Sequence, residues 1–210
     1  MAISIFPIGI HSEDVKAVFG SKNNELFVRL ISSAIYQRYD EEYSFKRELE
    51  DLLYKYVPAE DRVIKPAKFF GLIKGNDGRG LEGEWFDYAF ALLILCYELG
   101  EQFLSYDEEI KIDDAWSDLS KKLKQLAPAY DLDKLFISKP IFDTPFKEHD
   151  EIKVNLLSYA EVHHLKFTLD AFSKMHNEKS NLFIQLHNVV SICDEKKLEL
   201  IIFIIDKVDD

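Results

Sequence analysis

The stretch WFDYAFALLILCYEL, residues 85–99, is apolar on nearly every side of the helix that its composition predicts. A helix that is apolar all round is normally buried all round. The stretch is shorter than the ~20 apolar residues that a membrane span needs. Asp87 and Glu98 lie near its two ends, and Gly100 follows it, where glycine commonly terminates a helix. We therefore expect this segment to be the buried central helix of the fold.

Length and composition favour an α+β fold that is predominantly helical. The 210 residues fit a single domain over residues 1–210, because one hydrophobic core can extend to ~200 residues before chains divide. Hydrophobic residues make up 47% of the chain, with 16 Phe and 10 Tyr, which is enough for a sizeable core. Only 8 Gly and 6 Pro argue against a turn-rich all-β fold.

Two strands are predicted near the ends of the chain. Residues 3–10 form an apolar run in which Pro7 restricts the strand to an edge or a bulge. Residues 198–205 form a nearly continuous run rich in isoleucine, typical of a strand that is covered on both faces. We expect these two strands to pair with each other in a small sheet, with the helices packed around this sheet and the central helix.

Several helices have clear local signals. Residues 24–35 carry apolar side chains three and four apart, which predicts one continuous amphipathic helix. Ser158 and Glu161 match a capping box at the start of another helix, with Leu157 and Val162 at the positions of a hydrophobic staple. A further helix is expected from about Ser180 to Lys197.

The net charge of −12 excludes some classes of function. An acidic chain is repelled by phosphate backbones, so we expect no binding of nucleic acid through a broad basic face. We find no membrane segment and no signal peptide, and we expect a cytoplasmic protein. Cys96 and Cys193 lie in apolar surroundings without a CxxC motif, which indicates two reduced core thiols.

Residues 105–118 hold six acidic residues and one lysine. One interpretation is a solvated helix entrance, in which Asp113 caps a helix and Asp114 lies at the positive end of its dipole. The other is a docking surface for a basic protein partner. The predicted partner-binding residues are Asp107, Glu108, Glu109, Asp113, Asp114 and Asp118.

A second candidate site lies around the glycine-rich segment at residues 75–83. This segment is neither a P-loop nor a dinucleotide-binding fingerprint, and a hinge or a plain connection also accounts for it. As an alternative function, it forms a lid over a small-molecule pocket beside the central helix. The predicted ligand-binding residues are Asp77, Arg79, Asp87 and Tyr88.

No constellation of catalytic residues is recognised, and we expect neither a cofactor nor a metal. The chain contains no Gly-x-Ser-x-Gly elbow. Glu161 and His164 share one helix face with the spacing used by di-iron bundles, but those bundles need the motif twice. Surface histidines account better for His163 and His164.

The run from Tyr88 to Gly100 resembles the central signature of a family of uncharacterised bacterial proteins, with a more distant likeness to the YfbM-like group. The opening strand and short helix up to residues 19–21, and the final helix and strand at residues 182–205, resemble the two ends of those proteins. Small acidic families of this kind often lie among toxin-immunity genes. The resemblance therefore implies a neutralising role and supplies no catalytic residues.

Two hypotheses follow from the sequence. The first is an intracellular protein-binding module, most concretely an immunity-type inhibitor that occludes a basic toxin through an acidic face. The second is a small-molecule enzyme or ligand-binding protein that uses the glycine-rich segment as a lid.

Overall fold

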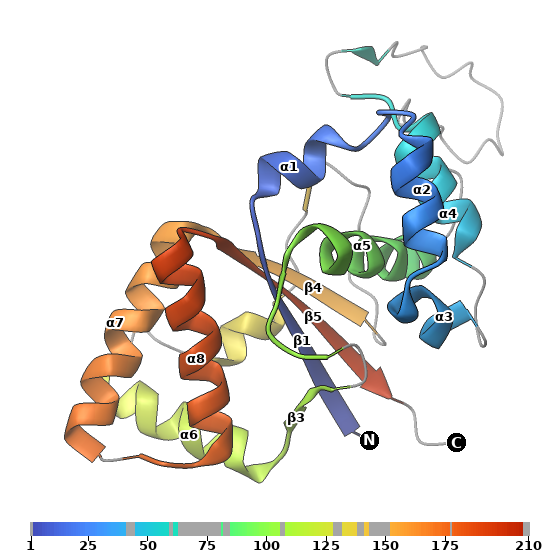
Figure 1. Cartoon of the computed structure of the whole chain (residues 1–210). Helices are drawn as coiled ribbons and strands as arrows, with labels where there is room; N and C mark the ends of the chain where they lie inside the picture. The colour runs from blue at the N-terminus through green and yellow to red at the C-terminus, as the bar shows by residue number, and fades with distance from the viewer. Residues whose placement is uncertain are drawn as a thin grey trace, which may run out of the picture. The chain divides into compact units, whose positions relative to one another are not determined.

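The chain has an α+β fold that is predominantly helical, as predicted (Figure 1). The computed structural model describes residues 2–40, 45–58, 61–62, 81, 85–105, 108–127, 132–137, 141–142, 152–176 and 178–207. The chain divides into two compact units. We call Met1–His11 together with Gly100–Asp210 the sheet unit, and Ser12–Leu99 the helical unit. The single domain over residues 1–210 stays a prediction.

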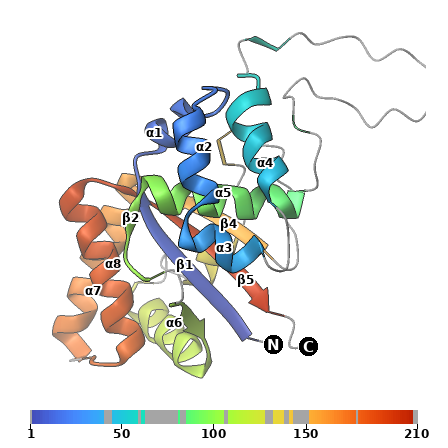
Figure 2. The same cartoon turned by 45° about the vertical axis from the view of Figure 1, so that its right-hand side comes forward.

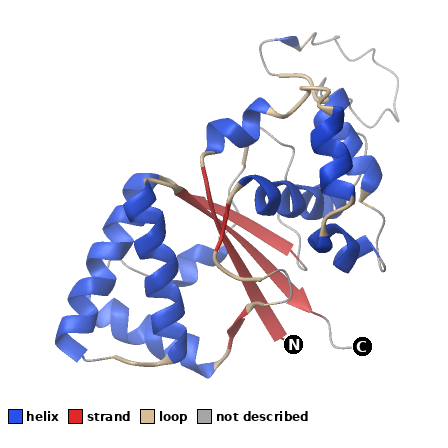
Figure 3. Ribbon diagram, viewed as in Figure 1, coloured by secondary structure: helices blue, strands red, loops and turns tan. Residues whose placement is uncertain are grey.

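The sheet unit contains one antiparallel sheet with the order β2-β1-β5-β4, and β3 also pairs with β1 (Figure 3). The long strands are β1 (Ala2–Ile10) and β5 (Glu199–Lys207), and the shorter ones are β4 (Ile152–Leu157), β2 (Glu101–Gln102) and β3 (Ile110–Ile112). The sequence analysis anticipated the two long strands, β1 and β5. It missed β2 and β3, which are too short to carry a clear alternating pattern.

The two terminal strands pair along their whole length, which confirms the expected pairing. The register runs from Ala2 opposite Lys207 to Ile10 opposite Glu199. As a result the start of β1 and the end of β5 lie side by side (Figures 1 and 2).

Pro7 is predicted to restrict β1 to an edge or a bulge. The edge is wrong, because β1 lies between β5 and the two short strands. The register with β5 also passes Pro7, opposite Ile202, without a bulge. On the side of those strands, Ile3–Ile5 pair with β3, whereas Ile8 and Gly9 pair with β2. Pro7 lies in the gap between these two pairings. A missing backbone N–H is best tolerated where no partner strand requires it, and we attribute the presence of proline in this strand to the gap.

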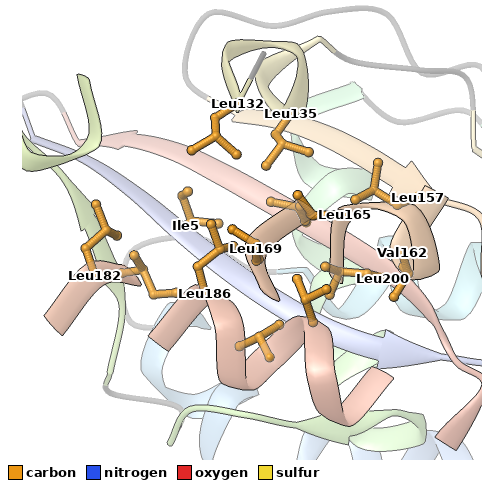
Figure 4. Packing of buried hydrophobic residues seen from close by; sticks show 14 of the residues in the cluster. Ile5, Leu132, Leu135, Leu157, Val162, Leu165, Leu169, Leu182, Leu186 and Leu200 are labelled. Atoms are coloured by element: carbon orange, nitrogen blue, oxygen red, sulfur yellow. The ribbon is translucent and has the colours of Figure 1, made fainter. Parts of the chain in front are cut away.

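Three α-helices of the sheet unit pack against the sheet: α6 (Asp114–Leu126), α7 (Tyr159–His176) and α8 (Asn181–Lys196). Figure 4 shows leucines of α7 and α8 meeting Ile5 of β1 and Leu200 of β5, with Leu132 and Leu135 of the short 3-10 helix η3 (Leu132–Phe136) nearby. Ile201 and Phe203, on the alternate positions of β5, are fully buried as well. The expectation of a strand covered on both faces is therefore confirmed.

The capping box at the start of α7 is confirmed. The Ser158 backbone N–H donates to Glu161 Oε2 at 2.8 Å, and the Glu161 backbone N–H donates to Ser158 Oγ at 3.4 Å. Leu157 and Val162, the predicted staple residues, are both buried in the same hydrophobic cluster. This local signal was readable because both partners lie within four residues of each other.

The helical unit places α5 (Trp85–Leu99) in contact with four shorter helices (Figure 2). These are α1 (Ser12–Ala17), α2 (Asn24–Ile31), α3 (Ala34–Asp40) and α4 (Lys46–Glu50), the last of which continues as the π-helix η1 (Asp51–Lys55). From Ala91 to Cys96 every residue of α5 is 0% exposed. The predicted buried central helix is confirmed.

The single helix predicted over residues 24–35 is interrupted, and α2 and α3 are separate helices. Ser32 Oγ donates to the Val28 carbonyl at 2.8 Å, and Ser33 Oγ donates to the Leu30 carbonyl at 2.7 Å. Serine hydroxyls that bond to backbone carbonyls compete with the helical pattern and favour a break. The apolar residues keep their helical spacing across Ser32 and Ser33, so the sequence pattern did not indicate the break.

In the part of the chain that the structure describes, no helix has the length and apolarity required to cross a bilayer.

Helix α8 ends in a Schellman motif at Lys197, which adopts the left-handed conformation with φ of 57°. The Leu198 N–H donates to the Cys193 carbonyl at 2.8 Å and the Lys197 N–H to the Asp194 carbonyl at 3.2 Å. This position normally favours glycine, because the left-handed conformation costs a residue with a Cβ roughly 1–2 kcal/mol.

We therefore predict that Lys197→Gly raises the free energy of unfolding by about 1 kcal/mol, because it relieves this conformational cost. Urea denaturation of the whole chain measures the change. The matched control is Glu195→Gly, at an exposed position within α8, which should lower stability by roughly 1 kcal/mol. A loss of stability in Lys197→Gly would contradict the prediction.

Candidate functional site

The acidic residues predicted to bind a partner gather around β3 and the start of α6. Glu108 and Glu109 precede β3, Asp113 lies between β3 and α6, and Asp114 and Asp118 belong to α6. All are exposed except Glu109, which is half-buried. Asp107 lies outside the described residues. We call the five described residues the acidic surface.

Two members of the acidic surface have local structural roles. Asp113 is the N-cap of α6, and its Oδ1 accepts a hydrogen bond from the Ala115 N–H at 2.9 Å. Glu108 Oε2 accepts from the Ser105 N–H at 2.9 Å, which closes the turn before β3. The expected capping role of Asp113 is confirmed. The carboxylates of both residues are occupied by the backbone of their own segment.

Asp114 and Asp118 have no such role. They lie one turn apart on the same side of α6, and neither forms a hydrogen bond or an ion pair within the described residues. The helix dipole favours an acid in the first turn, which accounts for Asp114, but its effect falls off before Asp118. Local helix energetics therefore do not explain the carboxylate of Asp118.

Basic residues near this pair are partly neutralised. Lys122, one turn beyond Asp118, donates to Glu178 Oε2 at 3.0 Å. Lys122 and the Ser180 backbone lower the pKa of Glu178 to about 2, so the Glu178 carboxylate stays ionised at neutral pH. Lys111 and Lys121 are exposed in the same region. The region around the acidic surface therefore has a net negative charge but also contains positively charged side chains.

The second set of predicted residues is divided by the structure. Asp77 and Arg79 lie outside the described residues, as does the glycine-rich segment apart from residue 81. Asp87 and Tyr88 belong to the first turn of α5. Tyr88 is only 1% exposed, and its hydroxyl donates to Asp51 Oδ2 at 2.7 Å.

Asp51 is the centre of a buried polar network that the sequence analysis missed. Its side chain is 0% exposed, and Lys55 Nζ lies 2.6 Å from its second oxygen, Oδ1. Asp51 and Lys55 are the two ends of η1, and π-helical turns occur frequently at functional positions. The signal that could have found this network is the Asp-Lys pair at four-residue spacing inside an apolar run.

Glu48 adds a third carboxyl group to this part of the helical unit. It is 5% exposed, and burial raises its pKa above the ordinary value, with smaller contributions in the same direction from the charges of Asp87 and Asp51. The Glu48 backbone and Arg47 oppose this shift. The arrangement can hold a proton in an apolar surrounding. Tyr88 and Asp51 are directed at each other, however, so a ligand would have to compete with an existing hydrogen bond, and the ligand-binding role of Asp87 and Tyr88 stays a prediction.

No group of three or more histidine, cysteine or acidic side chains with the geometry of a metal site occurs among the residues whose placement is described. The Glu161 carboxylate accepts from the Ser158 hydroxyl at 2.9 Å as part of the capping box. Cys96 and Cys193 are free and buried, and burial raises the pKa of both thiols, that of Cys193 to about 12. Neither thiol has the lowered pKa that a nucleophile requires.

The chain matches no protein-family model, no curated protein and no solved structure. The resemblance of Tyr88–Gly100 and of the two chain ends to uncharacterised bacterial proteins therefore stays a prediction. The candidate sites rest on their own geometry.

Tyr88→Phe removes a hydrogen bond from the buried carboxyl of Asp51. We expect the free energy of unfolding to fall by about 1.5–3 kcal/mol, the range for hydrogen bonds to charged groups. Urea denaturation measures this loss. The matched control is Tyr54→Phe, because Tyr54 bonds to Asn24 at an exposed position and its loss should change stability by less than about 0.5 kcal/mol. Equal effects of the two variants would argue against an energetic role for the buried network.

Glu48→Gln tests the raised pKa of Glu48. Because the native state binds the carboxyl proton more tightly than the unfolded state does, the contribution of Glu48 to stability falls as pH rises from the unfolded pKa through the raised native pKa. We therefore expect Glu48→Gln to be more stable than the parent at neutral pH, with the advantage shrinking in acid.

Urea midpoints of both proteins across the acid-to-neutral range measure this difference, and Glu25→Gln serves as the exposed control. A difference that is constant with pH would contradict the prediction.

Proposed function

We propose that this protein is an intracellular protein-binding module, and most concretely an immunity-type inhibitor that neutralises a basic toxin. The partner would bind the acidic surface at the start of α6. The observation that carries the proposal is the pair of exposed carboxylates on Asp114 and Asp118, which pair with no cation in the described part of the chain. A cationic side chain of a partner would satisfy them without displacing an existing contact.

Electrostatics support a basic partner. The net charge of −12 would attract a cationic protein over a distance set by the Debye length, ~8 Å at physiological ionic strength. Such attraction raises the rate of association and selects against acidic partners. The acidic surface is also attached to a rigid element, because Trp116, 2% exposed, and Leu123, 0% exposed, anchor α6 in the core. A preorganised surface loses less entropy on binding.

The intracellular part of the proposal is supported by the cysteines. Cys96 and Cys193 are both free and fully buried, and they belong to different units of the chain. Unpaired core thiols are typical of proteins that function in a reducing compartment.

The alternative function, binding or turnover of a small molecule beside α5, has less support. Ligand sites normally present polar groups toward an open concave surface. Tyr88 is buried and bonded to Asp51, and Asp51 is also paired with Lys55. These contacts are typical of a structural network. The Tyr88 hydroxyl is already engaged by Asp51, so it offers little support for ligand binding.

Neutralising the free carboxylates tests the proposed function. We expect the double variant Asp114→Asn/Asp118→Asn to bind its partner about tenfold more weakly, because two exposed charge contacts of up to ~1 kcal/mol each are lost. The partner is captured from the native host at low salt with the tagged chain and identified, and its Kd is then measured by calorimetry. Affinity of the parent should also fall as salt is raised.

The matched control is Glu25→Gln/Glu195→Gln, which removes the same amount of charge from exposed positions outside the acidic surface. This control should retain the parent affinity. If both double variants weaken binding equally, only the total charge matters and the proposed surface is wrong. If no basic protein is captured at low salt, the proposed function itself is wrong.

A further inference from the structure

The outer face of α7 exposes an unusual amount of apolar surface. Phe167 is 69% exposed, whereas phenylalanine is among the residue types most often buried. Met175, 65% exposed, and Tyr159, 38% exposed, lie on the same helix. A concentration of large exposed apolar side chains commonly marks an interaction surface.

These side chains form one row along the helix. Tyr159, His163, Phe167, Ala171 and Met175 follow each other at four-residue spacing, and residues so spaced form a ridge on a helix surface. Within the row, the large Phe167 is followed one turn later by the small Ala171. The small Ala171 side chain therefore leaves room on the helix surface next to the protruding Phe167 side chain.

This order of large and small side chains is self-complementary. If a second α7 packs antiparallel, with the two-fold axis midway between Phe167 and Ala171, each Phe167 meets the Ala171 of the other copy. An interface related by a two-fold axis requires this reciprocity, in which one residue contacts another and the second contacts the first.

The polar side chains in the row and beside it are already ordered within one copy. His163 Nδ1 lies 2.7 Å from Asp194 Oδ1, and His187 Nε2 lies 2.8 Å from Asp170 Oδ1. Lys166 Nζ donates to the other Asp170 oxygen at 2.6 Å. The two histidine–carboxylate pairs link α7 to α8, and the Lys166–Asp170 pair lies within α7. Association would therefore immobilise few additional polar side chains, and the entropic cost of binding is reduced.

Charge also favours this face for contact between two copies. The chain as a whole carries −12, so two copies repel each other on balance. Helix α7 has no formal net charge, because its two acids are balanced by two lysines: Glu161, Asp170, Lys166 and Lys174.

We propose that the outer face of α7 binds a second copy of this chain, forming a two-fold symmetric dimer in which Phe167 packs against Ala171 of the partner copy. This inference does not depend on the proposed function. The acidic surface on α6 and the row on α7 share no residue, and they can be tested with separate variants.

Sedimentation velocity over a range of concentrations tests the proposal. The parent chain should shift from monomer to dimer as its concentration rises. Phe167→Glu should raise the dimer dissociation constant by roughly thirtyfold or more, the effect of removing a central aromatic contact. Ile137→Glu is the matched control, because Ile137 is also a large exposed apolar residue, at 56%, and lies outside α7. It should dimerise like the parent.

Ala171→Phe separates specific packing from general hydrophobic association. The substitution adds apolar surface, so unspecific association would become stronger. In the proposed dimer it places a phenylalanine against Phe167 of the other copy, and the dissociation constant should rise by about tenfold or more. Circular dichroism and thermal unfolding at low concentration check that each variant is folded.

Three outcomes would overturn the proposal: a parent chain that stays monomeric at its highest attainable concentration, a dimer that Phe167→Glu leaves unchanged, or a dimer that Ala171→Phe strengthens.

Discussion

The antiparallel pairing of β1 with β5 is the constraint on which the sheet unit depends. It joins residues 2–10 to residues 199–207, although the whole helical unit lies between β1 and the rest of the sheet unit in the sequence. Closing so long a loop costs conformational entropy before any contact is gained. Burial of β5 on both faces, with Leu200, Ile201 and Phe203 all at 0% exposure, supplies the compensating hydrophobic free energy.

The helical unit depends on a different balance. Its centre combines an apolar helix that is fully buried from Ala91 to Cys96 with the carboxyl group of Asp51, which is also 0% exposed. A buried carboxylate is strongly destabilising unless it is paired and hydrogen-bonded. Tyr88 and Lys55 provide one partner for each oxygen, and the π-helical turn η1 holds the carboxyl between them. The hydrogen bond to Asp51 therefore explains the tyrosine at position 88 as a structural residue, without a ligand.

The acidic residues of the acidic surface are equivalent in the sequence, but the structure shows that they have different hydrogen-bonding partners. Asp113 and Glu108 accept hydrogen bonds from nearby backbone N–H groups, so their charges serve the local fold. Asp114 and Asp118 project from the same segment without such partners in the described residues. The proposed partner contact therefore narrows from a cluster of six predicted residues to two carboxylates on one helix.

The sequence alone determined the buried central helix, the capping box of α7 and the strand character of both ends, because each is expressed within a few neighbouring residues as periodicity, apolarity or a cap. Tertiary structure decided the rest. The central position of β1 despite Pro7, and the contact of Tyr88 with Asp51 across 37 residues, arise from pairings between distant segments. Such pairings depend on which surfaces meet in the folded chain, and a local sequence pattern does not specify these long-range contacts.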